Sequence, residues 1–390
     1  MTSTPASAPS PAPAGVSAWV SVDLDAIRDN VAELARRAGP AQVMAVVKGD
    51  AYGHGLVPSA RAALAGGATW LGVAQLDEAL DLRKAGVTAP LLTWLFPPGA
   101  DVGGAIDADI EVTVGSEWTL AAVVAAARER GRPVRVQVKV DTGLGRGGIL
   151  TDWSEMVARV ATAQAEGAIE VTGVWSHFAW ADAPQHPTVR AQQVRFVEAA
   201  AELERAGVGP VMRHLANSAA TLTNPSASFD MVRPGVAVYG LSPVPDLGDP
   251  AHFGLREAMR VTARLTLVKR ARAGQGVSYG HEYVTDRDTV LGLVPMGYAD
   301  GIPRSAGGRG PVRVGGQRLP VAGRVCMDQF VVDLGPGYAG GAGDEVVVLG
   351  RAADGEPSAQ DWADAAGTIN YEIVTRMAPR LPRVLLGGRG

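Results

Sequence analysis

Short apolar runs that alternate with amphipathic helical patterns are the feature of this sequence that most restricts its fold. The runs predict strands at Val43–Val47, Thr69–Ala74, Leu91–Leu95, Ile110–Val114, Val134–Val140, Ile169–Trp175, Met212–Ala216 and Phe229–Val232. Helical patterns between them include Leu76–Lys84, Glu117–Arg130, Asp152–Glu166 and Val189–Ala206. This alternation predicts a parallel sheet, and its eight units favour a closed (β/α)8 barrel. An open doubly wound sheet is the structural alternative, because its strands have the same pattern.

The composition along the chain predicts four parts. Residues 1–14 are rich in Pro, Ala and Ser and predict a disordered tail, and residues 15–24 alternate like a strand that we expect to join a C-terminal β domain. Residues 25–240 form the predicted barrel. Residues 241–390 begin with a Pro- and Gly-rich linker, Leu241–Leu255, and continue as a mostly β domain. Its expected strands are Val261–Val268, Val290–Pro295, Val312–Val314, Arg324–Val332 and Glu345–Leu349, and a capping box at Ser358 opens one helix.

Charge and cysteine content exclude several classes of protein. The 36 basic and 40 acidic residues give a net charge of −4 without a block of like charge, which argues against nucleic acid or an anionic membrane as partner. No uninterrupted apolar stretch is long enough to predict a membrane span. The single cysteine, Cys326, excludes an intramolecular disulfide, so we expect a cytoplasmic protein. We predict no metal site.

Lys48 follows the first predicted barrel strand and precedes a glycine-rich turn. Only four of the 36 basic residues are lysines, so an amine at this position is unusual for the chain. A desolvated lysine can lose its proton and act as a nucleophile, whereas arginine stays protonated. The alternative is a lysine that simply extends to solvent from the end of a strand.

Chemically active residues follow several of the predicted strands. In a barrel the loops after the strands share one face, where active sites gather. These loops contain Lys48, Tyr52, Lys139, Arg146, His177, His214, Asn217, Ser218, Arg233, Gly235 and Val236. Individually, Lys139 could form an ion pair with Asp141 or another acid, His177 could be a core histidine, and Asn217 could be only a helix N-cap. A helix N-terminus at a barrel mouth also binds phosphate, and phosphate beside an imine-forming lysine indicates pyridoxal 5′-phosphate (PLP).

A series of motifs along the chain resembles the alanine racemase family in order and spacing. The motifs are AVVKGDAYGHG from Ala45, KVDTGLGRGG from Lys139, HFAWAD from His177, HLANSAA from His214, MVRPGVAVYG from Met231, VSYG from Val277, GYADGIPR from Gly297, GRVCMDQ from Gly323 and INYE from Ile369. The resemblance covers the chain from Trp19 to Leu385. Gly49 and Gly147 depart from residues common in the family, although neither change removes a functional group.

The resemblance implies a PLP-dependent racemase that interconverts L- and D-alanine and supplies D-alanine for peptidoglycan. It implies Lys48 and Tyr279 as the two catalytic bases, with Tyr279 reaching the site from the other subunit of a homodimer. Implied cofactor contacts are Lys48, Tyr52, His177, Asn217, Ser218, Arg233, Gly235, Val236 and Tyr371. Implied substrate contacts are Arg146, Met327 and Asp328. Lys139 matches a lysine that is carbamylated in many members of the family, and Tyr298, Arg304 and Arg324 match positions along the entryway.

Racemisation needs one proton removed from one face of Cα and another delivered to the opposite face, so two bases serve it. A phenol has a usual pKa of about 10, and we expect His177 and nearby arginines to stabilise the phenolate of Tyr279. Arg233 facing the pyridine nitrogen cannot readily give up a proton, which favours a racemase over a decarboxylase. Three alternatives stay open: a racemase of broader specificity, a PLP-dependent decarboxylase, and a PLP-binding homeostasis protein that resembles the barrel alone.

Overall fold

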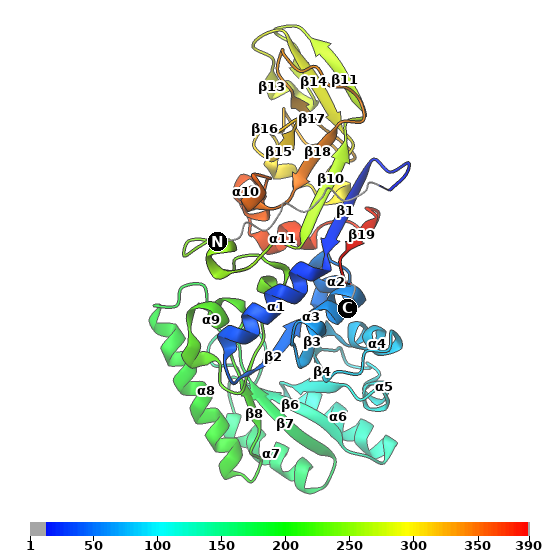
Figure 1. The fold of residues 1–390 in the computed structure, drawn as a ribbon. Helices are drawn as coiled ribbons and strands as arrows, with labels where there is room; N and C mark the ends of the chain where they lie inside the picture. Colours follow the sequence, from blue (N-terminus) through cyan, green and yellow to red (C-terminus); the bar gives the residue numbers. More distant parts are fainter. Residues whose placement is uncertain (1–12, 389–390) are drawn as a thin grey trace.

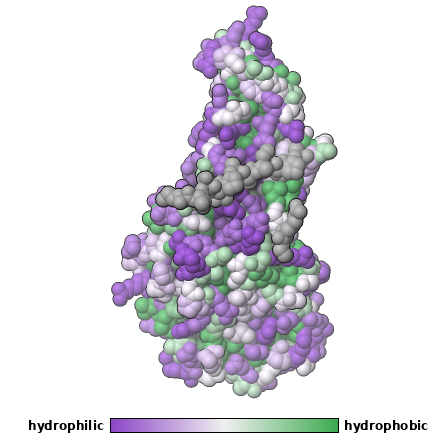
Figure 2. Space-filling model, in the orientation of Figure 1, coloured by the Kyte–Doolittle hydropathy of each residue, from purple (hydrophilic) through white to green (hydrophobic). Residues whose placement is uncertain are grey.

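The computed structural model describes residues 13–388. Figure 1 shows an elongated molecule in which a helix-covered barrel occupies one end and a region of short strands the other. Figure 2 shows the same tapering outline, with hydrophilic and hydrophobic residues intermixed on the visible face. The predicted tail of residues 1–14 lies outside the described residues, except for residues 13 and 14. Within the described part of the chain, every helix is too short or too polar to traverse a lipid bilayer.

Eight parallel strands form the barrel, in the order β8-β7-β6-β5-β4-β3-β2-β9. They are β2 (Gln42–Val46), β3 (Trp70–Gln75), β4 (Leu91–Leu95), β5 (Glu111–Val114), β6 (Val134–Lys139), β7 (Ile169–Trp175), β8 (Met212–His214) and β9 (Met231–Val232). Hydrogen bonds from Asp230 N to Arg213 O (3.1 Å) and from Arg233 N to Ala216 O (2.8 Å) join β9 to β8. The predicted (β/α)8 barrel is confirmed, and each strand end lies within two residues of its predicted position.

Helices surround the barrel because their apolar faces pack on the outward side chains of the strands. They are α1 (Leu24–Ala38), α3 (Leu56–Ala65), α4 (Leu76–Lys84), α5 (Val102–Asp107), α6 (Glu117–Arg130), α7 (Trp153–Ala165), α8 (Pro187–Arg205) and α9 (Ser218–Thr223). The helix α6 illustrates how the sequence sets the ends, since Ser116 caps its start and Gly131, with φ of 68°, ends it in the left-handed conformation.

The remaining strands form three small sheets at the other end of the molecule. A six-stranded sheet has the order β16-β15-β18-β10-β1-β19, a three-stranded sheet has the order β11-β14-β17, and β12 pairs with β13. These strands are β1 (Ala18–Asp23), β10 (Met259–Arg264), β11 (Leu267–Ala271), β12 (Gly276–Val277), β13 (Tyr283–Val284), β14 (Thr289–Val294), β15 (Pro311–Val314), β16 (Gln317–Pro320), β17 (Phe330–Asp333), β18 (Glu345–Leu349) and β19 (Arg383–Leu386). The N-terminal strand β1 pairs with β10 and β19, so it lies in the sheet of the C-terminal region. Two helices, α10 (Ala359–Ala366) and α11 (Asn370–Thr375), complete this region.

Three predicted segments of the C-terminal region differ from the structure. The predicted strand Val261–Val268 is two strands in different sheets, because Leu265 bonds to the Gly343–Asp344 turn and redirects the chain. The predicted strand Arg324–Val332 begins only at Phe330, where β17 starts. The residues before it form a turn, which a hydrogen bond from Cys326 N to Gln329 O (2.9 Å) closes. The predicted linker is packed rather than free, with Phe253 and Leu255 buried.

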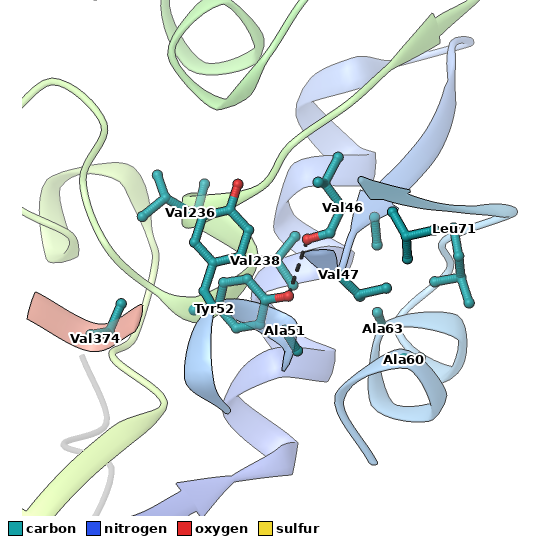
Figure 3. Packing of buried hydrophobic residues seen from close by; sticks show 14 of the residues in the cluster. Val46, Val47, Ala51, Tyr52, Ala60, Ala63, Leu71, Val236, Val238 and Val374 are labelled. Carbon is teal, nitrogen blue, oxygen red and sulfur yellow. Dashed lines mark hydrogen bonds between the residues drawn. The ribbon is translucent and has the colours of Figure 1, made fainter. Parts of the chain in front are cut away.

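The core continues from the barrel into the C-terminal region beside the turn that follows β2. Figure 3 shows Val46, Val47 and Tyr52 packed with Val236 and Val238, and the Tyr239 hydroxyl donates a hydrogen bond to Val46 O at 3.1 Å. Val374 of α11 approaches the same cluster from the C-terminal region (Figure 3). The segment that carries Lys48 is therefore held from both ends of the molecule.

Candidate active site

Lys48 opens a turn of left-handed backbone at the carboxyl end of β2. The short segment α2 (Lys48–Gly53) has φ values of 65°, 52°, 55° and 54° at its four residues from Gly49 to Tyr52. Each non-glycine residue in this conformation costs about 1–2 kcal/mol, so the surrounding contacts must hold it. Two carboxylates do so, because Gly49 N donates to Glu78 Oε1 (2.6 Å) and Leu56 N donates to Asp50 Oδ1 (2.7 Å). The turn fixes Lys48 at the barrel mouth and directs Tyr52 into the core.

Four other predicted residues lie at the same end of the barrel. Lys139 is the last residue of β6, His214 is the last of β8, His177 follows β7, and Arg233 follows β9. Two of their charges lie against the same aromatic ring: the Lys139 Nζ lies 4.4 Å from the centre of the Trp175 ring, and the Arg233 guanidinium carbon lies 4.9 Å from it. The parallel strands therefore bring these residues together, as the sequence predicts.

The mouth is strongly basic and partly desolvated. Burial, followed by the charge of Arg146, lowers the pKa of Lys48, although Glu78 opposes this shift. The same two causes lower the pKa of Lys139 to about 8, and burial lowers the pKa of Arg233 to about 9. A group of cations in a low-dielectric mouth favours anionic ligands such as phosphate and carboxylate.

The Asp141 carboxylate shapes the loop that carries Arg146. Its Oδ1 accepts hydrogen bonds from the backbone N–H groups of Gly143 and Leu144, both at 2.8 Å, and its Oδ2 accepts one from Arg146 N at 3.1 Å. These bonds tie Asp141 to its own loop, and its charge raises the pKa of Lys139 less than burial and the charges of Arg146 and Arg233 lower it. Among the described residues, the Lys139 ammonium forms no ion pair with Asp141 or with another acid, and it lies over Trp175.

A compact cradle forms where α9 and η2 (Val236–Tyr239) begin. Asn217 caps α9 by accepting from Ala220 N at 3.1 Å, and Ser218 Oγ accepts from Gly235 N at 2.8 Å. A Cβ placed on Gly235 would lie 2.3 Å from the Tyr52 hydroxyl oxygen, so only glycine permits this approach. Tyr371 lies next to Tyr52, with ring centroids 6.4 Å apart. Hydroxyls and helix-start N–H groups beside a basic mouth fit the phosphate of PLP.

Arg233 contacts both histidines of the mouth. Its NH1 group lies 3.0 Å from His214 Nδ1, and its NH2 group lies 3.4 Å from His177 Nδ1 and donates to Ser176 O at 2.7 Å. Burial and the charge of Arg233 hold the pKa of both histidines well below the usual value. Both imidazoles are therefore neutral groups that can accept from Arg233.

Tyr279, the residue implied to come from a second subunit, is exposed on the C-terminal region, as are Met327 and Tyr298. Tyr279 lies between β12 and β13 and is 71% exposed. Strand β13 is at the end of the molecule opposite the barrel (Figure 1). Met327 is 54% exposed and Tyr298 is 40% exposed. Within one chain the structure does not bring Tyr279 to Lys48. Ion pairs hold the segments that carry these residues. Glu282, close to Tyr279 in the sequence, pairs with Arg324, and Asp328, next to Met327, pairs with Arg380.

Sequence reasoning gave no role to several residues that the structure places around the mouth. Trp94 and Trp175 lie beside the two lysines, and Glu78 holds the turn after Lys48. Gln137 lies 2.7 Å from His214 Nε2 through its Oε1 atom. The sequence contained a signal for Gln137, because the alternation of side chains along β6 puts it on the same face of the strand as Lys139. Among the described residues, no cluster of His, Cys, Asp and Glu is arranged to hold a metal ion.

Comparison with known proteins assigns the chain to a family. The family model described as "Alanine racemase, N-terminal domain" matches residues 22–243, and the model of the C-terminal domain matches residues 258–385. The chain is 59% identical to an alanine racemase of Beutenbergia cavernae over 94% of this chain and 97% of the relative. It is 57% identical to that of Frankia casuarinae over 93% and 94% of the two chains. The crystal structure of alanine racemase from Streptomyces lavendulae has a TM-score of 0.95 at 56% identity and covers 96% of this chain and 98% of that one. The chain therefore belongs to the alanine racemase family.

Proposed function

We propose that this protein interconverts L- and D-alanine with PLP as its cofactor. The observation that carries the proposal is the basic barrel mouth, in which Lys48 has a lowered pKa and Ser218, Gly235 and the start of α9 lie at the same end of the barrel. A lysine whose pKa is lowered is more often neutral and therefore more nucleophilic toward an aldehyde. When bound, PLP supplies an electron sink that makes the Cα–H of an amino acid acidic.

The residues of the mouth have separate tasks in holding PLP. Lys48 would form the covalent link, and Tyr52, Ser218 and Tyr371 with the N–H groups of Gly235 and Val236 would hold the phosphate. Arg233 would donate a hydrogen bond to the ring nitrogen, with His177 and Asn217 as further contacts. The support is that Ser218 accepts a hydrogen bond from Gly235 N and that the Tyr52 hydroxyl fills the space beside the Gly235 Cα.

Two bases would move the protons. Lys48 takes or returns a proton on one face of the substrate Cα, and Tyr279 of a second subunit does so on the other. The exposure of Tyr279 and of Met327 beside it supports a homodimer in which each active site needs both chains. A site completed across the interface keeps the two bases on opposite sides without either one moving.

The substrate carboxylate would meet positive charge and a backbone donor. Arg146, oriented by the loop around Asp141, would bind it together with the N–H of Met327 of the second subunit, with Asp328 beside this contact. Carbamylation of Lys139 would convert a cation into an anion that pairs with Arg146. Tyr298, Arg304 and Arg324 would line the entryway.

A racemase of broader specificity is the competing function, because the volume available to the substrate side chain depends on the second subunit. A decarboxylase is disfavoured by Arg233, whose neighbours are two neutral histidines rather than an acid. The matched C-terminal domain argues against a homeostasis protein made of the barrel alone.

A chiral assay with a panel of L-amino acids tests the proposal. We expect D-alanine to form faster than any other D-amino acid, and the purified protein to show a visible cofactor band that borohydride abolishes. Lys48→Ala should lose both the band and the activity, whereas Lys269→Ala, at an exposed position of β11, should keep both. A colourless wild type saturated with PLP, or equal turnover of many amino acids, contradicts it.

We also propose a cytoplasmic location and a role in supplying D-alanine for peptidoglycan. The single cysteine, Cys326, supports a reducing compartment. Depletion of the protein in its own cells should create a requirement for external D-alanine, and growth without such a requirement contradicts the role.

A further inference from the structure

A line of hydrogen bonds crosses the barrel interior from Arg233 to a buried carboxylate. Arg233 NH1 lies 3.0 Å from His214 Nδ1, and His214 Nε2 lies 2.7 Å from Gln137 Oε1. Gln137 Nε2 in turn donates to Glu111 Oε2 at 2.7 Å. His214 and Gln137 are fully buried, and Glu111 is 2% exposed. The line therefore connects the mouth to β5 without reaching water.

The chemistry of the two ends allows only one direction for these bonds. Arginine can only donate, so His214 Nδ1 must accept and the imidazole proton must be on Nε2. An ionised carboxylate can only accept, so the Gln137 amide must turn its NH2 group toward Glu111 and its oxygen toward His214. The two requirements agree, and every group donates to the next one along the line.

The barrel is built to admit this line. Gln137 pairs with Gly173 of β7, and a Cβ on Gly173 would lie 3.1 Å from Gln137 Cδ, closer than most packed side chains allow. Thr172 Oγ1 donates to the same Glu111 oxygen at 2.7 Å, and Arg135 Nε lies 3.5 Å from Oε1. Burial raises the pKa of Glu111, while these donors favour its ionised form.

We propose that Glu111 is a positioning residue for Arg233, acting through Gln137 and His214 to fix the tautomer of His214 and the orientation of the guanidinium at the mouth. The nearest polar contacts of Arg233 are neutral groups, so Glu111 serves as its remote counter-ion. The effect of this line on racemisation rests on the proposed function, whereas the direction of its hydrogen bonds does not.

Glu111→Gln is the most informative variant because it keeps the shape of the side chain but replaces a group that only accepts hydrogen bonds with an amide that also donates them. In one orientation, the oxygen of the new amide faces Gln137 and Thr172, and its NH2 group faces the guanidinium of Arg135. In the other orientation, the NH2 group of the new amide faces the NH2 group of Gln137. Either orientation sets two donors against each other. The matched control is Asp109→Asn, which removes the other carboxylate paired with Arg135 (3.0 Å) but lies outside the line.

The direction of the line is tested by NMR of the holoenzyme labelled with ¹⁵N in its histidine rings. Long-range ¹H–¹⁵N correlation should show His214, assigned by its loss in His214→Gln, as a single neutral form protonated on Nε2. A proton on Nδ1 overturns the proposal. This measurement does not depend on whether the protein racemises alanine, so it separates failure of the line from failure of the proposed function.

The effect of the line is tested by a double-mutant cycle in alanine racemisation. Glu111→Gln and Gln137→Leu should each lower kcat about tenfold, and the double variant should lose no more than either single one, because both break the same connection. Asp109→Asn should keep kcat within twofold. Losses that multiply in the double variant, or an unchanged kcat in Glu111→Gln, overturn the proposal. Urea unfolding of each variant identifies any loss of activity that is caused by misfolding. If Gln137→Leu does not fold, Gly173→Ala replaces it in the cycle, because the added Cβ crowds Gln137 and disturbs the same hydrogen bonds.

Discussion

At the scale of single residues, the site depends on cations gathered in a partly buried mouth. Burial, and after it the charges of Arg146 and Arg233, lower the pKa of Lys48 and of Lys139, while burial alone lowers the pKa of Arg233. The free energy lost by gathering them is recovered when anions bind, so the same charges select phosphate and carboxylate ligands.

The pKa of Lys139 makes stability depend on pH. Its value of about 8 in the folded state lies below the usual 10.5, so between these values the unfolded chain binds more protons and stability rises with pH. We expect the free energy of unfolding of wild type relative to Lys139→Met to increase by about 2 kcal/mol from pH 7 to 10.5, after allowing for partial solvent screening. Urea titrations in CO2-free buffer measure it. The exposed Lys269→Met serves as control, and a difference that is flat with pH contradicts the shift.

Tyr279→Phe removes one of the two proposed bases and keeps the ring. The rate of racemisation should fall by about 10³-fold. The value of kcat/KM should fall by the same factor for L-alanine and for D-alanine, because the two enantiomers have equal free energy and their equilibrium constant is fixed at one. In deuterium oxide, Lys48 should still exchange the Cα hydrogen of the enantiomer that presents this hydrogen to it, while exchange from the other enantiomer should be lost. Mass spectrometry of each recovered enantiomer measures this, and exchange that is equally fast from both would rule out separate bases.

At the scale of elements, the left-handed turn after β2 is where sequence and conformation are most tightly linked. Gly49 has φ of 65° with open space around its Cα, and glycine adopts this conformation without strain. The next three residues are not glycine, so Glu78 and Asp50 must hold them through backbone bonds. Gly49, which differs from the residue common at this position in the family, thus lowers the conformational cost of the turn that places Lys48 at the mouth.

Gly49→Ala should therefore destabilise the protein by about 1 kcal/mol through backbone strain alone. Gly131→Ala, at the end of α6 with φ of 68° and equally open space, is the matched control and should cost a similar amount. Only Gly49→Ala should also weaken PLP binding, because its turn carries Lys48 and Tyr52. Urea unfolding and PLP titration compare them. Equal PLP affinities in the two variants would show that the turn does not govern the cofactor site.

At the scale of the whole molecule, the two ends of one chain hold different parts of the proposed site. Lys48 lies at the barrel mouth, and the exposed Tyr279 and Met327 lie on the C-terminal region. The packing of Tyr52 with Val374 and Tyr371 fixes how the two ends are oriented. In the proposed homodimer, a second chain related by a two-fold axis would join the two sets of residues at each site.

Mixing two inactive variants tests this arrangement. Lys48→Ala and Tyr279→Ala subunits, unfolded and refolded together in equal amounts, should regain about a quarter of wild-type activity, because half of the dimers are mixed and each has one intact site. Each variant refolded alone is the control. Mixed dimers that form, as seen by mass spectrometry, but remain inactive would exclude a shared site.

The amino-acid sequence by itself determined the barrel and the residues at its mouth. Buried parallel strands read as short runs of β-branched and aliphatic residues, and the loops after them lie at one end, so Lys48, Lys139, His177 and Arg233 could be placed together in advance. The C-terminal strands were harder, because at Leu265 an apolar pattern continues while the chain passes from one sheet to another.

Only the tertiary structure decided how these groups are connected. The bond line from Arg233 through His214 and Gln137 joins strands β9, β8, β6 and β5 and depends on the space that Gly173 leaves. The left-handed turn after Lys48 likewise depends on Glu78, which is distant in the sequence. A local pattern records which face of an element is buried, but hydrogen-bond partners and charge coupling follow from distances between elements, which exist only once the chain has folded.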